Sequence, residues 1–357
     1  MTLDNEKHPI DELQERLGAD WKMIAKAREH AVTSRARLKE KLSGLDSEDT
    51  SIVVFGSLAR DEFTSGSDID WTLLVDGQAS PEHLDNVLEI TKYVREVEGK
   101  PPGQEGTFEG LASSHDLIHK IGGSDDTNRN TTQRILLLLE SATIGRRDAH
   151  DRVVKNVLRR YVEEDYGLMR LSGPFYIPRF LQNDIARYWR TVAVDFAYKQ
   201  RQREDKGWAL RVTKLRMSRK LTYVSGLLTC FSCHFELFKG SKDTFDESSR
   251  ALAIVEYLFN YSQKTPLEIL AHVLNRFPHL DELARDLFDT YNEFLEMLDD
   301  EQKRDYLKNL QRDKITDDQI YEDTRRLGHN FQDSLTKLFL EENDTPLFEM
   351  TKAYGVF

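Results

Sequence analysis

The chain has 357 residues, of which 39% are hydrophobic and 31% are charged, and its formal net charge is −12. This composition describes a globular protein with room for two or three domains. It argues against a general nucleic-acid coat, because phosphate backbones need clustered Lys and Arg, and no run approaches the roughly 18 apolar residues of a membrane helix. The first ten residues lack the apolar core of a signal peptide, so we expect a cytoplasmic location.

The first hundred residues show a helical pattern and then two short strand patterns. Apolar residues recur at helical spacing over residues 10–42, which indicates one or two amphipathic helices. Short apolar runs at 51–55 and 69–75 indicate β-strands. Residues 81–97 have the pattern of a helix, and KPPGQEG at 100–106 is typical of a loop.

Strand signals almost vanish in the rest of the chain. A third strand is expected at residues 115–121, followed by the polar loop GGSDDTNRN and a buried helix at 131–144. After the linker SGPFYIP at 172–178, the pattern is helical, and its basic residues concentrate at 181–220. We therefore predict an α+β fold, in which a small α/β domain with a mixed sheet is followed by a mostly α-helical domain.

The stretch VVFGSLARDEFTSGSDIDWTLLV carries the clearest chemical signal. Asp68 and Asp70 stand two apart where a strand begins, so both side chains can reach one cation. Hard divalent ions such as Mg²⁺ prefer such oxygen ligands together with substrate phosphates. Gly56 and Ser57 end the preceding strand and let the backbone approach a phosphate closely. The arrangement suits a nucleoside triphosphate with two Mg²⁺ ions, whereas the structural alternative is a surface turn with two solvated aspartates.

The spacing of these residues resembles a known signature. FGS, ten residues and then DIDW is similar to the motif of the DNA polymerase β-like nucleotidyltransferase superfamily. Within it, the stretch most resembles the bacterial uridylyltransferase of the nitrogen-regulatory PII protein and its relatives. Their Gly-Arg-Gly-Glu-like run corresponds here to Arg60, Asp61 and Glu62, which makes Arg60 a candidate nucleotide ligand. The resemblance covers roughly residues 51–145.

The resemblance also implies a third carboxylate and a division of the chain. In the PII-modifying relatives an Asp stands shortly before a Val/Ile-Gly pair, and this order implies Asp116 as third metal ligand and general base. The loop after Gly122 departs from the family's usual run, so Asp125 and Asp126 are rivals. The implied parts are N-terminal helices (1–50) packing on a catalytic domain (51–166), and a helical domain (178–357) completing the nucleotide site.

The helical half supplies the remaining candidates. Superfamily members commonly hold the triphosphate with Lys and Ser side chains from a second, helical domain. Lys214 and Ser218 lie four apart in a basic helical segment and match that arrangement. Arg187 lies on the first long helix of this half, near the expected cleft. Cys230 and Cys233, in CFSC, are expected to be packed in an apolar segment rather than to bind a metal.

Together, these features predict a Mg²⁺-dependent nucleotidyltransferase that moves NMP from an NTP to a hydroxyl group, with Mn²⁺ as the alternative ion. The PII-like resemblance makes a protein side chain, in particular a Tyr hydroxyl, a reasonable acceptor alongside a small molecule. Because the chain is acidic, we do not expect bulk nucleic acid to be the acceptor. Two alternatives stay open: a synthase of a nucleotide second messenger, and a catalytically inactive module that senses NTP. The sequence leaves the base, the acceptor and the oligomeric state open.

Overall fold

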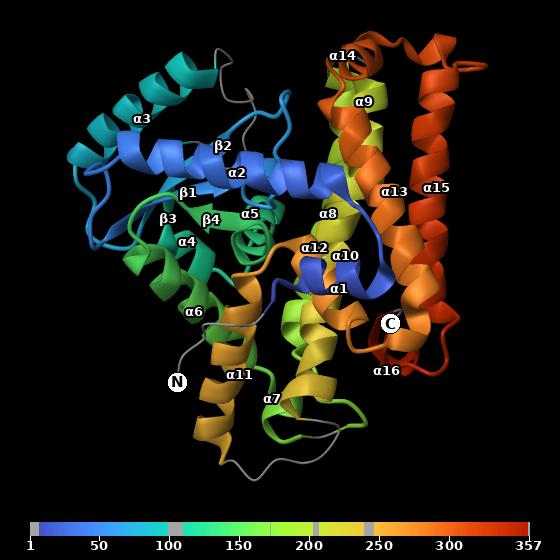
Figure 1. Cartoon of the computed structure of the whole chain (residues 1–357). Helices are drawn as coiled ribbons and strands as arrows, with labels where there is room; N and C mark the ends of the chain where they lie inside the picture. Colours follow the sequence, from blue (N-terminus) through green and yellow to red (C-terminus); the bar gives the residue numbers. More distant parts are fainter. Residues whose placement is uncertain (1–6, 99–109, 172, 203–206, 239–245, 356–357) are drawn as a thin grey trace.

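Four short strands form one mixed sheet at the side of a large helical assembly (Figure 1). The structure, a computed structural model, describes residues 7–98, 110–171, 173–202, 207–238 and 246–355. The strands are β1 (Thr50–Phe55), β2 (Asp70–Val75), β3 (Gly110–Ser113) and β4 (Ser141–Thr143), in the order β3-β2-β1-β4. Strand β1 pairs antiparallel with β2 and β4, whereas β2 and β3 are parallel, so the predicted mixed sheet is confirmed.

The strand predicted at residues 115–121 was wrong. Those residues belong to helix α4 (Ser114–His119), and the strand β3 comes just before it. The side chain of Ser113 caps this helix by accepting a hydrogen bond from the N–H of His115, and Asp116 pairs with Lys120 one turn later at 2.7 Å. Local capping and an i,i+4 ion pair therefore favour a helix over the strand that the apolar residues suggested.

The helix expected at residues 131–144 is present but shorter. It is α5 (Asn128–Leu139), which is buried along most of its length, and the chain then turns into the unpredicted strand β4. Among the described residues between 76 and 170, the other helices are α3 (Glu82–Glu98), α6 (Asp148–Glu163) and α7 (Tyr166–Met169). The loop expected at 100–106 lies outside the described residues.

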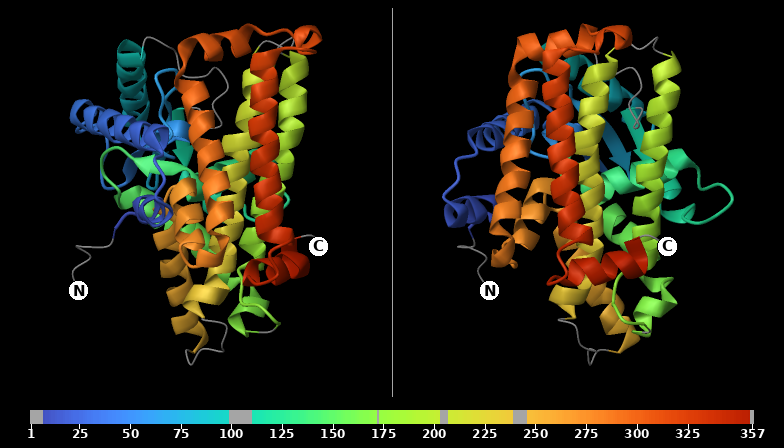
Figure 2. Two further views of the ribbon diagram at one scale, coloured as in Figure 1. Left: turned by 45° about the vertical axis from the view of Figure 1, so that its right-hand side comes forward. Right: turned by 90° about the vertical axis from the view of Figure 1, so that its right-hand side faces the viewer.

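The second half of the chain is helical, as predicted, and its long helices run side by side (Figure 2). It consists of α8 (Arg179–Gln202), α9 (Trp208–Lys214), α10 (Lys220–Ser232), α11 (Glu247–Ser262), α12 (Pro266–Leu274), α13 (Asp281–Asp299), α14 (Glu301–Asn309), α15 (Gln319–Leu340) and α16 (Pro346–Met350). A π-helical turn, η2 (Leu215–Arg219), joins α9 to α10 without a break in the helix. Such turns are rare and are frequently found at functional sites.

One large hydrophobic core joins the sheet to the helical half. On one face of the sheet, Val53, Phe55 and Leu74 belong to the same buried cluster as the helices of the second half. On the other face, Ile52 and Leu73 belong to a smaller cluster that includes residues of α2 (Lys22–Lys41) and α3. One face of the sheet therefore packs directly against the helical half.

The N-terminal helices contact both parts of the molecule. Helix α1 (Pro9–Leu17) packs against α12, so it adds to the helical half. Helix α2 packs against α13 with its first half, through Ile24 and Ala27, and against the sheet with its second half, through Ala31 and Leu38. Figure 1 shows α2 crossing from one part to the other.

Two expectations about special segments can be compared with the structure. In the part of the chain that it describes, no helix is both long enough and apolar enough to cross a membrane. Cys230 and Cys233 are free thiols, and both are buried in the large core. Burial raises the pKa of each thiol, as expected for packed side chains rather than reactive ones.

Candidate functional site

The motif residues lie at one end of the sheet, where β1 ends and β2 and β4 begin. Phe55, the last residue of β1, pairs with Asp70 on one side and with Ser141 on the other. Glu140, directly before β4, is thereby brought to the same end of the sheet as Asp70. Residues separated by about seventy positions in the chain thus meet because two antiparallel neighbours flank one central strand.

Gly56 allows the carboxylate of Asp70 to lie against the backbone of the turn. Its φ of +67° is in the left-handed region, and a Cβ built there would lie only 3.1 Å from Oδ2 of Asp70. Any other residue would be strained and would crowd this oxygen. Gly56 and Ser57 belong to a short 3₁₀ turn (Gly56–Leu58), so the chain does not continue into an α-helix after the strand.

The two aspartates differ in environment. Asp68 is exposed, Ile69 between them is buried, and Asp70 is half-buried at the start of β2. Burial raises the pKa of the Asp70 carboxyl, Arg219 opposes this, and the negative charge of Asp68 adds to it. A bound cation would offset the repulsion between the two carboxylates. Carboxylate oxygens are also the ligands that a hard divalent ion prefers, so Asp68 and Asp70 suit such an ion.

The loop that precedes Asp68 is held by the helical half. Ser65 donates hydrogen bonds from its backbone N–H and its hydroxyl to Asp299, each at 3.2 Å. Gly66 lies against Arg304, because a Cβ built at Gly66 would fall 1.9 Å from the Cζ atom of that arginine. The junction of α13 and α14 therefore fixes the loop that presents the first aspartate.

Next to the aspartates lies a buried ion network that we did not predict from the sequence. Arg60 donates to Glu62 at 3.0 Å and to Glu140 at 2.7 Å. Arg219 donates to the other oxygen of Glu140 at 2.5 Å, and Tyr291 donates to Glu62 at 2.7 Å. Burial alone would raise the pKa of Glu140, but Arg219 and Arg60 hold it below its usual range. The network links the motif turn to the π-helical turn η2 and to helix α13.

This network gives Arg60 a different role from the one predicted from the sequence. The sequence suggested it as a nucleotide ligand, but its side chain is only 6% exposed and is bonded to two glutamates. Arg60 therefore stabilises the turn through these buried ion pairs, and its side chain is not presented to a nucleotide. The one sequence signal for this network was the charged residue Glu140 at the end of the apolar run ILLLL, where an unpaired carboxylate would be costly.

Lys214 and Ser218, the two candidates around the π-helical turn, lie in different environments. Lys214 is half-buried, and its charge is felt by both Asp68 and Asp70; burial holds its pKa below its usual range. Ser218 is buried, and its hydroxyl lies 3.4 Å from that of Tyr291. The two side chains therefore differ in burial: Lys214 stays partly exposed, whereas Ser218 is enclosed beside Tyr291.

Arg187 lies in a different cluster. It donates to the backbone oxygen of Asp126 at 2.7 Å and to its carboxylate at 3.3 Å. Asp126 also receives two bonds from the fully buried Arg134, which holds the pKa of that carboxyl below its usual range against the effect of burial. These bonds tie the loop before α5 to α8, and they give both Arg187 and Asp126 a structural role.

Asp116 lies at the wrong end of the sheet to join the other two aspartates. In the parallel pair, Ser113 lies opposite Val75, the last residue of β2, whereas Asp70 is the first. Asp116 follows Ser113, is half exposed, and pairs with Lys120. Asp125, the other rival, is exposed in the same loop as Asp126. Among the described residues, no three His, Cys, Asp or Glu side chains are grouped to hold one metal ion.

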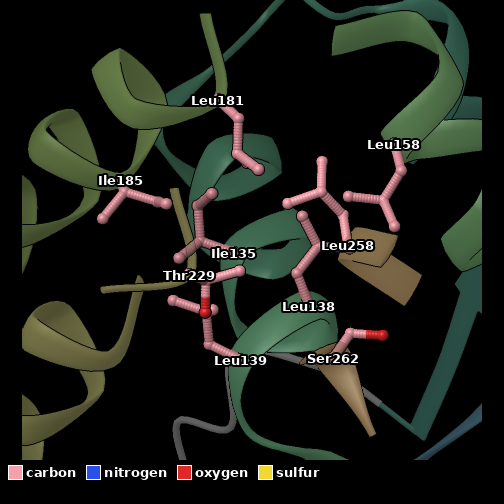
Figure 3. Close-up of a pocket in the computed structure, with 9 residues that line it drawn as sticks. All are labelled: Ile135, Leu138, Leu139, Leu158, Leu181, Ile185, Thr229, Leu258 and Ser262. Atoms are coloured by element: carbon pink, nitrogen blue, oxygen red, sulfur yellow. The ribbon is translucent and has the colours of Figure 1, made fainter. Parts of the chain in front are cut away.

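An enclosed cavity elsewhere in the fold is not a nucleotide site. Figure 3 shows it between α5, α6, α8, α10 and α11. Its lining consists of Ile135, Leu138, Leu139, Leu158, Leu181, Ile185, Thr229, Leu258 and Ser262. Nearly all of these side chains are aliphatic, and none is charged, so the cavity offers nothing to bind a triphosphate. It is a packing gap in the large core.

Comparison with known proteins agrees with the geometry of the turn. Residues 35–105 match the family model described as nucleotidyltransferase domain, a stretch that contains Gly56, Asp68 and Asp70. Comparisons with curated proteins and with solved structures returned no match. The chain thus carries a nucleotidyltransferase domain of the DNA polymerase β-like superfamily, and it is a nucleotidyl transfer enzyme.

Proposed function

We propose that this enzyme transfers NMP from an NTP to a hydroxyl group with the help of Mg²⁺ bound by Asp68 and Asp70. The observation that carries the proposal is the close approach of Gly56 to Asp70, at the end of the sheet where the cations Lys214 and Arg219 also act on that carboxylate. Two carboxylates and nearby positive charge suit a metal–triphosphate complex.

The donor set fits a hard divalent ion. Both side chains are carboxylates, and the backbone of Gly56 leaves room for one oxygen of Asp70. When bound, Mg²⁺ would lower the pKa of the acceptor hydroxyl and neutralise charge on the triphosphate. Mn²⁺ prefers the same kind of ligand and is the alternative ion.

The protein's own groups would bind and orient the substrate. The backbone of Gly56 and Ser57 would approach the phosphates at the open side of the turn. Lys214 would bind the triphosphate from the helical half, since its charge already interacts with both aspartates. The acceptor is a hydroxyl on a protein or a small molecule; the net charge of −12 disfavours bulk nucleic acid.

A transfer assay with matched carboxylate variants tests this function. The protein is incubated with each labelled NTP and Mg²⁺, and products are resolved by thin-layer chromatography and by gel. Asp68→Asn and Asp70→Asn should each lower NMP transfer at least a hundredfold, because each removes a metal ligand. Asp116→Asn, which changes an exposed Asp at the far end of the sheet, should retain wild-type transfer. Full activity of either motif variant at saturating Mg²⁺ would refute the proposal.

The same assay separates the alternatives. A labelled small product without added acceptor would indicate a synthase of a nucleotide second messenger. Label on the protein, or on an added protein, would indicate a side-chain acceptor. NTP binding without any product would indicate an inactive sensing module.

A further inference from the structure

Arg219 is the strongest unassigned cation beside the two aspartates. It lies at the end of the π-helical turn and is bonded to Glu140, which directly precedes Ser141; Ser141 and Asp70 both pair with Phe55, so Arg219 lies at the motif end of the sheet. Its bond to Glu140 uses Nη1, and the side chain keeps 35% of its surface exposed. A guanidinium carries five N–H donors, and the bond to Glu140 uses one of its nitrogens.

The other arginines in this region are held away from a ligand. Arg60 is buried between Glu62 and Glu140. Arg187 binds the backbone and side chain of Asp126. Arg187 and Arg219 are equally exposed, each with 35% of its side chain, but Arg219 is bonded to Glu140, at the end of the sheet where Asp70 lies, whereas Arg187 is bonded to Asp126 in the loop before α5.

Glu140 is built as an anchor for this arginine. It is 3% exposed, and its second oxygen accepts bonds from Arg60 at 2.7 Å and from Thr222 at 3.0 Å. Its carboxylate is therefore fixed on one side and receives Arg219 on the other. Glu140 precedes β4, so it belongs to the sheet, whereas Arg219 belongs to the helical half.

We propose that Arg219 binds the triphosphate of the nucleotide and that Glu140 positions its guanidinium for this contact. An arginine anchored by a carboxylate can direct its remaining donors at phosphate oxygens in a planar pair, with little freedom left to lose on binding. The nucleotide site is then complete only when the helical half is docked on the sheet. This inference rests on the proposed function, because it places the triphosphate beside Asp68 and Asp70.

Binding of inorganic tripolyphosphate with Mg²⁺, measured by calorimetry on the full chain, tests the contact without any base or acceptor. Arg219→Ala should weaken this binding about tenfold to a hundredfold, as loss of a charge-assisted contact does. Arg219→Lys keeps the charge opposite Glu140 but not the fork, so it should recover only part of the affinity.

Arg216→Ala is the matched control. It removes the same charge from the same π turn, but the Arg216 side chain packs against Gly328 of α15, away from the aspartates. It should leave tripolyphosphate affinity within about twofold. Melting curves of all variants show whether each is folded, and Arg219→Lys keeps the test informative if the alanine variant is unfolded.

The outcomes separate this inference from the proposed function. Unchanged affinity in folded Arg219 variants, or no binding by the wild type, would overturn it, even if the wild type transfers NMP. An equal loss in the Arg216 and Arg219 variants would overturn it as well, because the effect would then be general charge. If tripolyphosphate binding depends on Arg219 but no NTP yields a product, the role of Arg219 is supported and the proposed transfer reaction is refuted.

Discussion

Replacing Gly56 with Ala should damage activity far more than stability. The residue has φ +67°, so an alanine there costs roughly 1–2 kcal/mol of backbone strain. Its Cβ would lie 3.1 Å from Oδ2 of Asp70, which must then move by a few tenths of an ångström. Since a 1 Å misplacement at a reacting centre can cost about a hundredfold, we expect roughly a tenfold loss of turnover and a weaker response to Mg²⁺.

A substitution at a second glycine, Gly18, distinguishes the effect of backbone strain from the effect of the contact with Asp70. Gly18, at the end of α1, has φ +59°, and a Cβ built there meets no atom within 4 Å. Gly18→Ala should therefore lower the melting temperature by a similar few degrees and leave transfer unchanged. The assay is NMP transfer against Mg²⁺ concentration, with a melting curve for each variant. If Gly56→Ala loses stability like Gly18→Ala but keeps wild-type turnover and Mg²⁺ response, the contact with Asp70 has no part in catalysis.

Three further predictions follow from side-chain burial. Lys214→Ala should weaken NTP binding about tenfold to a hundredfold by calorimetry, with partial rescue by Lys214→Arg; a lowered melting temperature with unchanged affinity would leave Lys214 as a structural ion-pair partner. Burial beside Arg216 lowers the pKa of Lys220 from 10.5 to about 8, so the folded state binds its proton less well than the unfolded state. Stability should then rise with pH between these values, and Lys220→Met should raise the melting temperature at pH 7 but not at pH 10.5. The raised pKa of the buried Cys230 thiol predicts that it reacts with a thiol reagent only on unfolding; rapid reaction of the native protein would contradict this.

The chemistry of the motif turn was readable from the sequence because it is local. Strand β1, the glycine, the two aspartates and strand β2 lie within about 25 residues, and their types and spacing alone indicate a turn that binds a metal and a phosphate. The helical second half was also predictable, since helical periodicity repeats within a few residues of itself. The same reasoning failed at α4, where a capping serine and an ion pair decided the local structure.

Only the tertiary structure decided which other charges meet the aspartates. Parallel pairing of β3 with β2 carries Asp116 to the far end of the sheet, and no local pattern reveals the direction of that pairing. Glu140 reaches the motif because β4 pairs with β1, and Arg219 reaches Glu140 because the helical half packs on the sheet. These contacts join positions about 80 residues apart, so their residues share no local spacing that a sequence could display. Each depends on the burial of a whole sheet face, which is a property of the folded chain.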